Sequence, residues 1–283
     1  MKKKVFVIAF IVFSTTQLIA QNIYDYKHSL EFAEYLEKSR QFDFSIQEYE
    51  RLLFMHPNSD SLKLNIITNY RKAGYYSKCL DRSTQLFPEI FSAPQNIAKE
   101  YTTALILNKE YEQAKNYCSK NNTLSAIQKI HFISSAQLLQ FDWKGATKSL
   151  LTYDSLQKTY PDNNWQQAVA YKKLTEEETN ARYKKPAIAM SLSAIIPGLG
   201  KVYTKDYKDA LIGFIIVGSS AFNTYRGFSK HGINSAYGWV FGGVALGFYS
   251  GNIYGAYKAV KKYNHRLRDK IYNKVETEFI QSL

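Results

Sequence analysis

From Tyr26 to about Tyr171, apolar residues return every three or four positions, which is the spacing of one face of an α-helix. The stretches LEFAEYLEKSR, LKLNIITNYRKAG and IQKIHFISSAQLLQ show this pattern, with polar residues between the apolar positions. Each stretch is too short to bury its apolar face alone. We therefore predict a series of short amphipathic helices that pack against one another.

The same part of the chain repeats a second pattern, an aromatic residue followed three positions later by a small one. The pairs are Phe42 and Ser45, Tyr76 and Cys79, Tyr111 and Ala114, and Trp143 and Ala146. The aromatic positions lie 34, 35 and 32 residues apart. Prolines at 57, 88 and 161 end three of the units, because proline cannot continue a helix. This spacing predicts stacked helical hairpins.

The stretches NKEYEQAKNY and FDFSIQEYERLLFMHP resemble tetratricopeptide repeats. The resemblance covers about half the chain and implies three to four helical hairpins, closed by a helix from Asn164 to Thr179. Such arrays bind a protein or peptide along a concave face. Repeats that serve only as a spacer are the alternative.

Beyond Pro186 the pattern changes to long apolar runs. Ala187 to Ile196 is a short run that ends at Pro197-Gly198-Leu199-Gly200, a sequence typical of a turn or helix break. Two further runs, Ala210 to Tyr225 and Ala236 to Tyr257, contain no charged residue. They predict a helical hairpin associated with a membrane, with a glycine-rich pair of strands as the alternative.

Four glycines in the second run, Gly243, Gly247, Gly251 and Gly255, are spaced four residues apart. On a helix they share one face, where another helix can approach closely. We predict that they pack helices together, and Gly213 and Gly218 of the first run are candidates to face them. Self-association of the chain through this stripe also stays open.

Lysines and tyrosines alternate after the Pro-Gly turn, which is typical of a membrane–water interface. The turn resembles a small, biochemically uncharacterised membrane domain of Gram-negative envelope proteins with the signature Pro-Gly-x-Gly-Gln-x-Tyr. The positions that match are Pro197, Gly198, Gly200, Tyr203 and Lys208, while Lys201 stands where glutamine is usual. The resemblance implies a membrane-associated domain and supplies no catalytic residue.

Charge is unevenly distributed. The net charge is +13, yet from Gln21 to Asn180 there are 19 basic and 19 acidic residues. From Ala181 to the end there are 15 basic and 5 acidic residues. Basic residues beside apolar runs favour an anionic lipid surface. No nucleic-acid-binding motif accompanies them, so we expect no nucleic acid partner.

The first residues, MKKKVFVIAFIVFSTTQLIAQ, have the layout of a secretory leader, with lysines, an apolar core and Ala20 before the exit. We predict a cleaved leader and therefore export, with an uncleaved anchor as the alternative. The two cysteines, Cys79 and Cys118, fall at apolar helix positions, so we expect buried free thiols rather than a disulfide.

No pattern of catalytic residues emerges. The five histidines show no metal-ligand spacing, and neither a Gly-x-Ser-x-Gly element nor a phosphate loop occurs in the sequence. We therefore expect no enzyme, no metal and no cofactor.

The predicted fold is all-α, a repeat solenoid of helical hairpins followed by a glycine-rich apolar helical hairpin. Its segments are a leader at 1–20, repeats at 21–180, a membrane hairpin domain at 181–263 and a basic C-terminal helix at 264–283. The expected function is an exported, membrane-attached adaptor of a bacterial envelope, with repeats on the periplasmic side that bind an envelope protein. One alternative is a structural subunit of a membrane complex in which the apolar hairpin is the working part. Another is a soluble periplasmic binding module.

Overall fold

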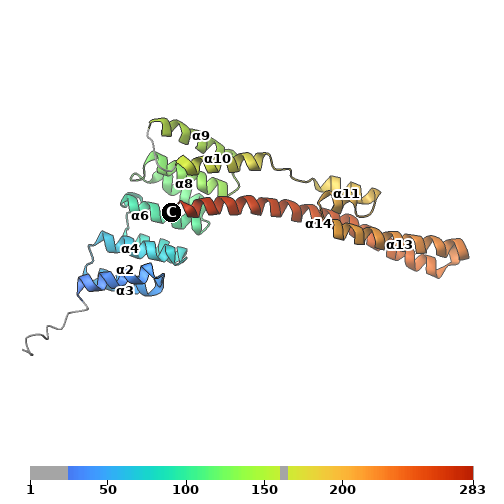
Figure 1. The fold of residues 1–283 in the computed structure, drawn as a ribbon, viewed down its shortest axis with the longest axis horizontal. Coiled ribbons are helices and arrows are strands. Elements are labelled where there is room, and N and C mark those ends of the chain that lie inside the picture. Colours follow the sequence, from blue (N-terminus) through green and yellow to red (C-terminus); the bar gives the residue numbers. More distant parts are fainter. Residues whose placement is uncertain (1–24, 160–164, 283) are drawn as a thin grey trace, which may run out of the picture. The chain divides into compact units, whose positions relative to one another are not determined.

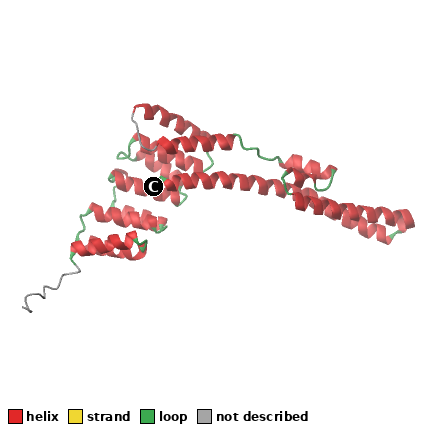
Figure 2. Cartoon of the chain, viewed as in Figure 1, coloured by secondary structure: helices red, strands yellow, loops and turns green. Residues whose placement is uncertain are grey.

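The computed structural model describes residues 25–159 and 165–282. These residues form helices joined by turns, without a strand among them (Figure 2). The chain is therefore all-α, which confirms the predicted class. The predicted leader, residues 1–20, lies outside the described residues, as does Pro161.

The chain divides into two compact units after Ala136. We call residues 25–136 the N-terminal unit and the described residues from Gln137 onward the C-terminal unit. The predicted boundary between residues 180 and 181 therefore falls inside the C-terminal unit.

The N-terminal unit is built from consecutive helix pairs (Figure 1). In chain order its elements are α2 (Tyr26–Lys38), α3 (Phe42–Met55), α4 (Asp60–Lys72), α5 (Tyr76–Leu86), the 3-10 turn η1 (Ile90–Ser92), α6 (Gln95–Leu107), α7 (Tyr111–Lys120) and α8 (Ala126–Leu139), whose last residues enter the C-terminal unit. Consecutive helices from α2 to α7 pack on one another, and a cluster of Ala33, Tyr49, Leu52 and Ile66 joins the apolar faces of α2, α3 and α4. The thiols of Cys79 and Cys118 are free and buried, as predicted.

The repeated aromatic residues mark helix starts. Helices α3, α5, α7 and α9 begin at Phe42, Tyr76, Tyr111 and Trp143. The small residue three positions later is buried in all four helices, and its size lets the preceding helix approach. The Ser45 hydroxyl, for example, donates to the Ala33 carbonyl oxygen at 3.0 Å.

A single turn type precedes each of these four helices. Two residues before the aromatic, the backbone takes a left-handed conformation, at Arg40, Gly74, Lys109 and Phe141. The amide of the next residue then donates to the carbonyl oxygen five positions earlier, for example from Gln41 to Leu36 at 2.8 Å. This is the Schellman ending of a helix, and here it recurs with the period of the repeat.

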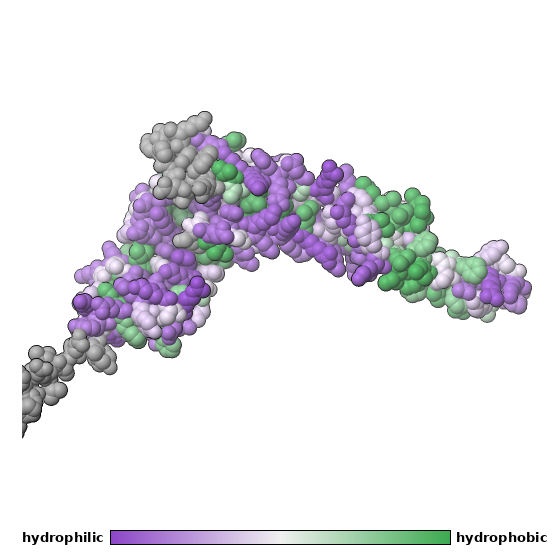
Figure 3. All heavy atoms as spheres, viewed as in Figure 1, coloured by the Kyte–Doolittle hydropathy of each residue, from purple (hydrophilic) through white to green (hydrophobic). Residues whose placement is uncertain are grey.

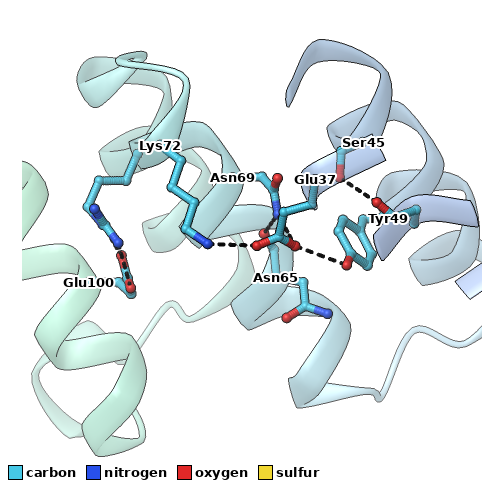
Figure 4. A network of polar contacts seen from close by, with 9 residues as sticks. Glu37, Ser45, Tyr49, Asn65, Asn69, Lys72 and Glu100 are labelled. Atoms are coloured by element: carbon cyan, nitrogen blue, oxygen red, sulfur yellow. Dashed lines mark hydrogen bonds and ion pairs between the residues drawn. The ribbon is translucent and has the colours of Figure 1, made fainter. Parts of the chain in front are cut away.

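A carboxylate joins the first three helices of the N-terminal unit (Figure 4). Glu37 of α2 accepts hydrogen bonds from the Tyr49 hydroxyl at 3.2 Å, the Asn69 amide at 3.1 Å and the Lys72 ammonium at 2.7 Å. In the next step along the chain, Arg71 of α4 pairs with Glu100 of α6. The polar contacts therefore run from one helix pair to the next.

The C-terminal unit is organised around one long helix. Its elements are α9 (Trp143–Thr159), α10 (Trp165–Thr179), α11 (Pro186–Ile195), α12 (Leu199–Tyr203), α13 (Tyr207–His231), the 3-10 turn η2 (Gly232–Asn234) and α14 (Ala236–Gln281). Helix α14 packs on α13, α11 and α10 in turn along its length (Figure 1). The residues predicted to form a separate C-terminal helix, 264–283, continue α14 without a break as far as Gln281.

Candidate functional site

The Pro-Gly turn connects α11 to α12 and depends on glycine. Pro197 and Gly198 follow the end of α11, and Gly198 has a φ of +94°, a conformation that other residues rarely adopt. A Cβ atom at Gly198 would also overlap the Ala210 carbonyl oxygen at the start of α13. The turn therefore fixes α12 between α11 and α13.

Gly200 lies where α12 crosses α11 and α14. A Cβ atom there would overlap the Ala189 carbonyl oxygen and lie 2.7 Å from the Ala256 Cβ atom. The Gly200 amide donates to the buried Ser193 hydroxyl at 3.1 Å. The absence of a side chain at this position lets three helices meet.

Tyr203 closes the same junction. Its ring packs against Ala189, Ala256 and Val260, and the Lys184 ammonium lies 4.4 Å from the ring centroid. The structure thus brings Pro197, Gly198, Gly200 and Tyr203 together at the junction of α11, α12 and α14. Lys208, the fifth matched position, is exposed on the first turn of α13 and is not part of it.

Lys201, which stands where the resembled signature has glutamine, also belongs to this junction. Its ammonium lies 3.4 Å from the Asp209 carbonyl oxygen, and its Cε atom would lie 3.2 Å from a Cβ atom at Gly255. The aliphatic part of the Lys201 side chain therefore packs over Gly255, the fourth glycine of the stripe.

The other glycines of the stripe face open space. A Cβ atom at Gly243, Gly247 or Gly251 would meet nothing within 4 Å, and the same holds for Gly218. Gly243, Gly247 and Gly251 line cavities beside α13 and make no close contact with it. A role in packing against another chain stays a prediction.

Helix α13 approaches α14 at Gly213, one of the two glycines expected to face the second run, and at Gly227 and Gly238, which the spacing did not single out. A Cβ atom at Gly227 would lie 2.7 Å from the Gly238 Cα atom, and one at Gly213 would lie 3.1 Å from the Asn252 amide oxygen. Asn252 is buried, and its side-chain amide has no hydrogen-bond partner in the described chain. The close contacts lie at the two ends of the α13–α14 pair.

The outer surface of the α13–α14 pair is apolar. Leu211, Ile215, Phe222 and Tyr225 form a stripe along α13, and each is more than half exposed. On α14 the exposed apolar residues include Tyr237, Trp239, Val240, Val244, Leu246, Phe248 and Tyr254. Figure 3 shows hydrophobic residues gathered beside α11 and along the pair, with hydrophilic residues at its tip.

Charged residues lie at the two ends of this apolar surface and not within it. Arg226 and Lys230 lie near the tip of the pair, and Lys201, Lys205 and Lys208 lie at the opposite end. Within residues 25–159 and 165–282, none of the helices is both long enough and apolar enough to cross a membrane.

Comparison with protein-family models and with curated proteins gives no match.

Proposed function

We propose that the chain is a membrane-attached adaptor of a bacterial cell envelope. In this proposal the α13–α14 pair is an apolar helical hairpin that inserts into lipid, and the N-terminal unit is a tetratricopeptide-like solenoid that binds an envelope protein. The observation that carries the proposal is the exposed apolar surface on both helices of the pair.

An apolar surface of this extent favours an apolar environment over water. Each large apolar side chain contributes about 1.5–3 kcal/mol when it is fully buried. Both helices contribute exposed apolar residues, and Ala210–Tyr225 and Ala236–Tyr257 contain no charged residue. A protein partner would cover one face, whereas lipid surrounds both helices.

The residues at the edges of this surface support lipid as the occupant. Tyr207, Tyr225, Trp239 and Tyr254 are exposed aromatic residues with polar groups, the type that concentrates at membrane–water interfaces. The apolar run of α13 has 16 residues, about 24 Å of helix, against about 30 Å of hydrocarbon in a bilayer. The proposal is therefore insertion of the hairpin as a unit, not a crossing by α13 alone.

The adaptor half of the proposal rests on the recurring turn. Four Schellman endings, each followed by an aromatic residue and a buried small residue, give the helix pairs a common geometry. Stacked pairs of this kind present an extended surface for a protein or peptide.

Flotation of the whole chain with lipid vesicles tests the attachment. The chain should float with vesicles that contain anionic lipid, and the double variant Leu211→Glu/Leu246→Glu should stay in the aqueous fraction. Phe54→Glu is the matched control, because Phe54 is 89% exposed on α3 in the N-terminal unit. Equal flotation of all three proteins would contradict the proposal.

Protease treatment of spheroplasts tests the orientation. Digestion of the N-terminal unit from outside would support export of the repeats, whereas protection in intact spheroplasts would place the repeats in the cytoplasm.

The open glycine stripe favours a second candidate function, a structural subunit in which the hairpin is the working part. Gly247→Leu/Gly251→Leu would then abolish assembly, while deletion of residues 21–136 would preserve it. An adaptor would show the reverse dependence. This deletion leaves α9 and α10, which belong to the C-terminal unit, in place.

A further inference from the structure

The C-terminal unit contains a cavity of about 880 Å³ at the middle of α14. Its aromatic walls are Phe141, from the turn before α9, Trp143, the first residue of α9, and Tyr183, from the segment after α10. The remaining lining residues are Glu178, Lys261, Lys262, Asn264, His265 and Arg268. The volume lies within the range of protein ligand pockets.

The walls of this cavity are held by contacts within the chain. Phe141 has a φ of +63°, and its ring centroid lies 5.8 Å from that of Tyr272. Asn264 accepts from the Lys184 amide and donates to the Lys184 carbonyl oxygen, both at 2.9 Å. This pair of hydrogen bonds fixes the extended segment that carries Tyr183. The site is therefore formed before any ligand arrives.

The positive charges spread along the helix instead of converging on one point. The Lys261 ammonium lies 4.6 Å from the Tyr257 ring centroid, one turn earlier on α14. The His265 ring lies 3.2 Å from the Asp269 carboxylate, one turn later. Lys262 and Arg268 are exposed and form no ion pair within the described chain. From Lys261 to Arg268 the helix rises about 10 Å, the length of about three extended residues.

We propose that this cavity binds an acidic peptide segment of another protein. Carboxylates of the peptide pair with Lys262 and Arg268, and an aromatic or aliphatic side chain of the peptide packs against Phe141 and Trp143. A single phosphate is a poorer fit, because it requires cations that converge. A flat bilayer is also a poorer fit, because the aromatic walls make the site concave.

Glu178 makes the two sides of the cavity electrostatically different, which sets the orientation of a bound peptide. Its carboxylate is the one negative group among the lining residues, and the Tyr183 hydroxyl donates to it at 3.4 Å. Burial and Glu178 raise the pKa of Tyr183, while Arg268 opposes this rise, so the phenol remains a neutral donor. In the bound peptide, backbone amides or a basic residue face Glu178, and the acidic residues of the peptide face α14.

The proposal adds to the proposed function a second protein-binding site, which requires no contact with lipid. Its test is fluorescence anisotropy with the whole 283-residue chain and a labelled heptapeptide, a phenylalanine flanked on each side by three glutamates. Lys262→Glu/Arg268→Glu should weaken binding by about tenfold or more, because close charge pairs across an interface become repulsive. A heptapeptide with alanine in place of phenylalanine should also bind more weakly.

Arg266→Glu/Lys270→Glu is the matched control. It reverses two exposed charges on the same helix that do not line the cavity, and it should weaken binding by about threefold or less through long-range electrostatics alone. Equal losses in the two double variants would overturn the proposal, as would undetectable binding of the peptide. Competition by inorganic phosphate or by anionic vesicles at least as effective as that of unlabelled peptide would also overturn it.

A further variant separates this proposal from membrane attachment. Leu211→Glu/Leu246→Glu, designed to abolish flotation, should bind the peptide with unchanged affinity. Its failure to bind, with its helix content intact by circular dichroism, would overturn the independence of the two sites.

Discussion

At the residue scale, the four turns before α3, α5, α7 and α9 share one left-handed backbone conformation, which Lys205 also adopts before α13. Glycine, the residue best suited to it, occupies only one of these four turns. Gly74 has a φ of +80°, whereas Arg40, Lys109 and Phe141 adopt +60° to +63° with a side chain. A residue with a Cβ atom pays about 1–2 kcal/mol for this conformation. Three of the four turns therefore retain strain that glycine would remove.

Exchanges at these turns should change stability in opposite directions. Lys109→Gly should raise the free energy of unfolding by about 0.5–1 kcal/mol, and Gly74→Ala should lower it by about 1 kcal/mol. A Cβ atom at Gly74 meets nothing within 4 Å, so its cost comes from the backbone alone. Urea unfolding followed by circular dichroism measures both. A lower free energy of unfolding in Lys109→Gly would contradict backbone strain at Lys109.

A second pair of glycines separates close packing from open surface. Gly200→Ala should destabilise the C-terminal unit by about 1–3 kcal/mol, because its Cβ atom overlaps the Ala189 carbonyl oxygen. Gly247→Ala should instead stabilise α14 by about 0.5–1 kcal/mol, since alanine favours helix and the position is open. Thermal unfolding of the two variants gives the comparison, and similar melting temperatures would argue against the tight junction at Gly200.

At the scale of elements, Glu37 links three helices through one carboxylate. Glu37→Ala should lower the free energy of unfolding by about 1–2 kcal/mol, because Tyr49 loses its acceptor and Asn69 and Lys72 each lose one. Glu34→Ala is the control. Glu34 makes only an exposed contact with Lys38 at 3.8 Å, and its loss should cost less than about 0.5 kcal/mol.

The same carboxylate gives this effect a pH dependence. Burial alone would raise the pKa of Glu37, but the hydrogen bonds from Lys72 and Asn69 outweigh burial and lower it below its ordinary value of 4.5. A carboxyl whose pKa is lowered by folding stabilises the fold above 4.5, and this contribution is lost as the pH falls through the folded pKa. The difference between wild type and Glu37→Ala in urea should therefore shrink at low pH, and an unchanged difference would count against the linkage.

The sequence predicts helix starts and buried positions where these depend on residues that are close together in the chain. Phe42, Tyr76, Tyr111 and Trp143 were singled out by spacing and begin four helices. The contact between α13 and α14 was not readable in this way. A four-residue spacing shows which glycines share a face, but it does not show which face turns toward the neighbour. The structure places Gly213, which the sequence did suggest, and Gly227 and Gly238, which it did not, at that contact, while a Cβ atom at Gly243, Gly247 or Gly251 would meet nothing within 4 Å.

At the scale of the whole molecule, the place of α10 could not be inferred from local pattern. The sequence predicted α10 as a closing helix of the repeats, and in the structure α10 packs on the preceding helix α9 and also on α14, about 100 residues further along the chain. Gln167 donates to the Glu278 carbonyl oxygen at 2.9 Å, and Lys274 pairs with Glu177 at 2.6 Å. The cavity depends on this distant pairing, which leaves no signal in the spacing of either segment.

Truncation tests how much of the C-terminal unit depends on the last turns of α14. Deletion of residues 264–283 removes Ile271, Val275 and Phe279, each 1% exposed or less. At about 1.5–3 kcal/mol for each buried apolar side chain, the loss approaches the stability of a typical domain. We expect rapid proteolysis within α9 and α10 in this variant. Deletion of residues 281–283 alone should leave the proteolysis pattern unchanged, and resistance of the longer truncation would contradict the packing.

Because α14 is continuous, it is a stiff element of fixed length. Its 46 residues, about 69 Å, contain no proline, and unbroken hydrogen bonds resist twisting along the whole length. Five residues, about 8 Å of helix, separate the end of the apolar run at Tyr257 from Lys262, so α14 acts as a spacer of fixed length between the apolar surface and the cavity. In the proposal made above, the peptide site therefore keeps a constant separation from the lipid-binding surface, whichever of the two is occupied.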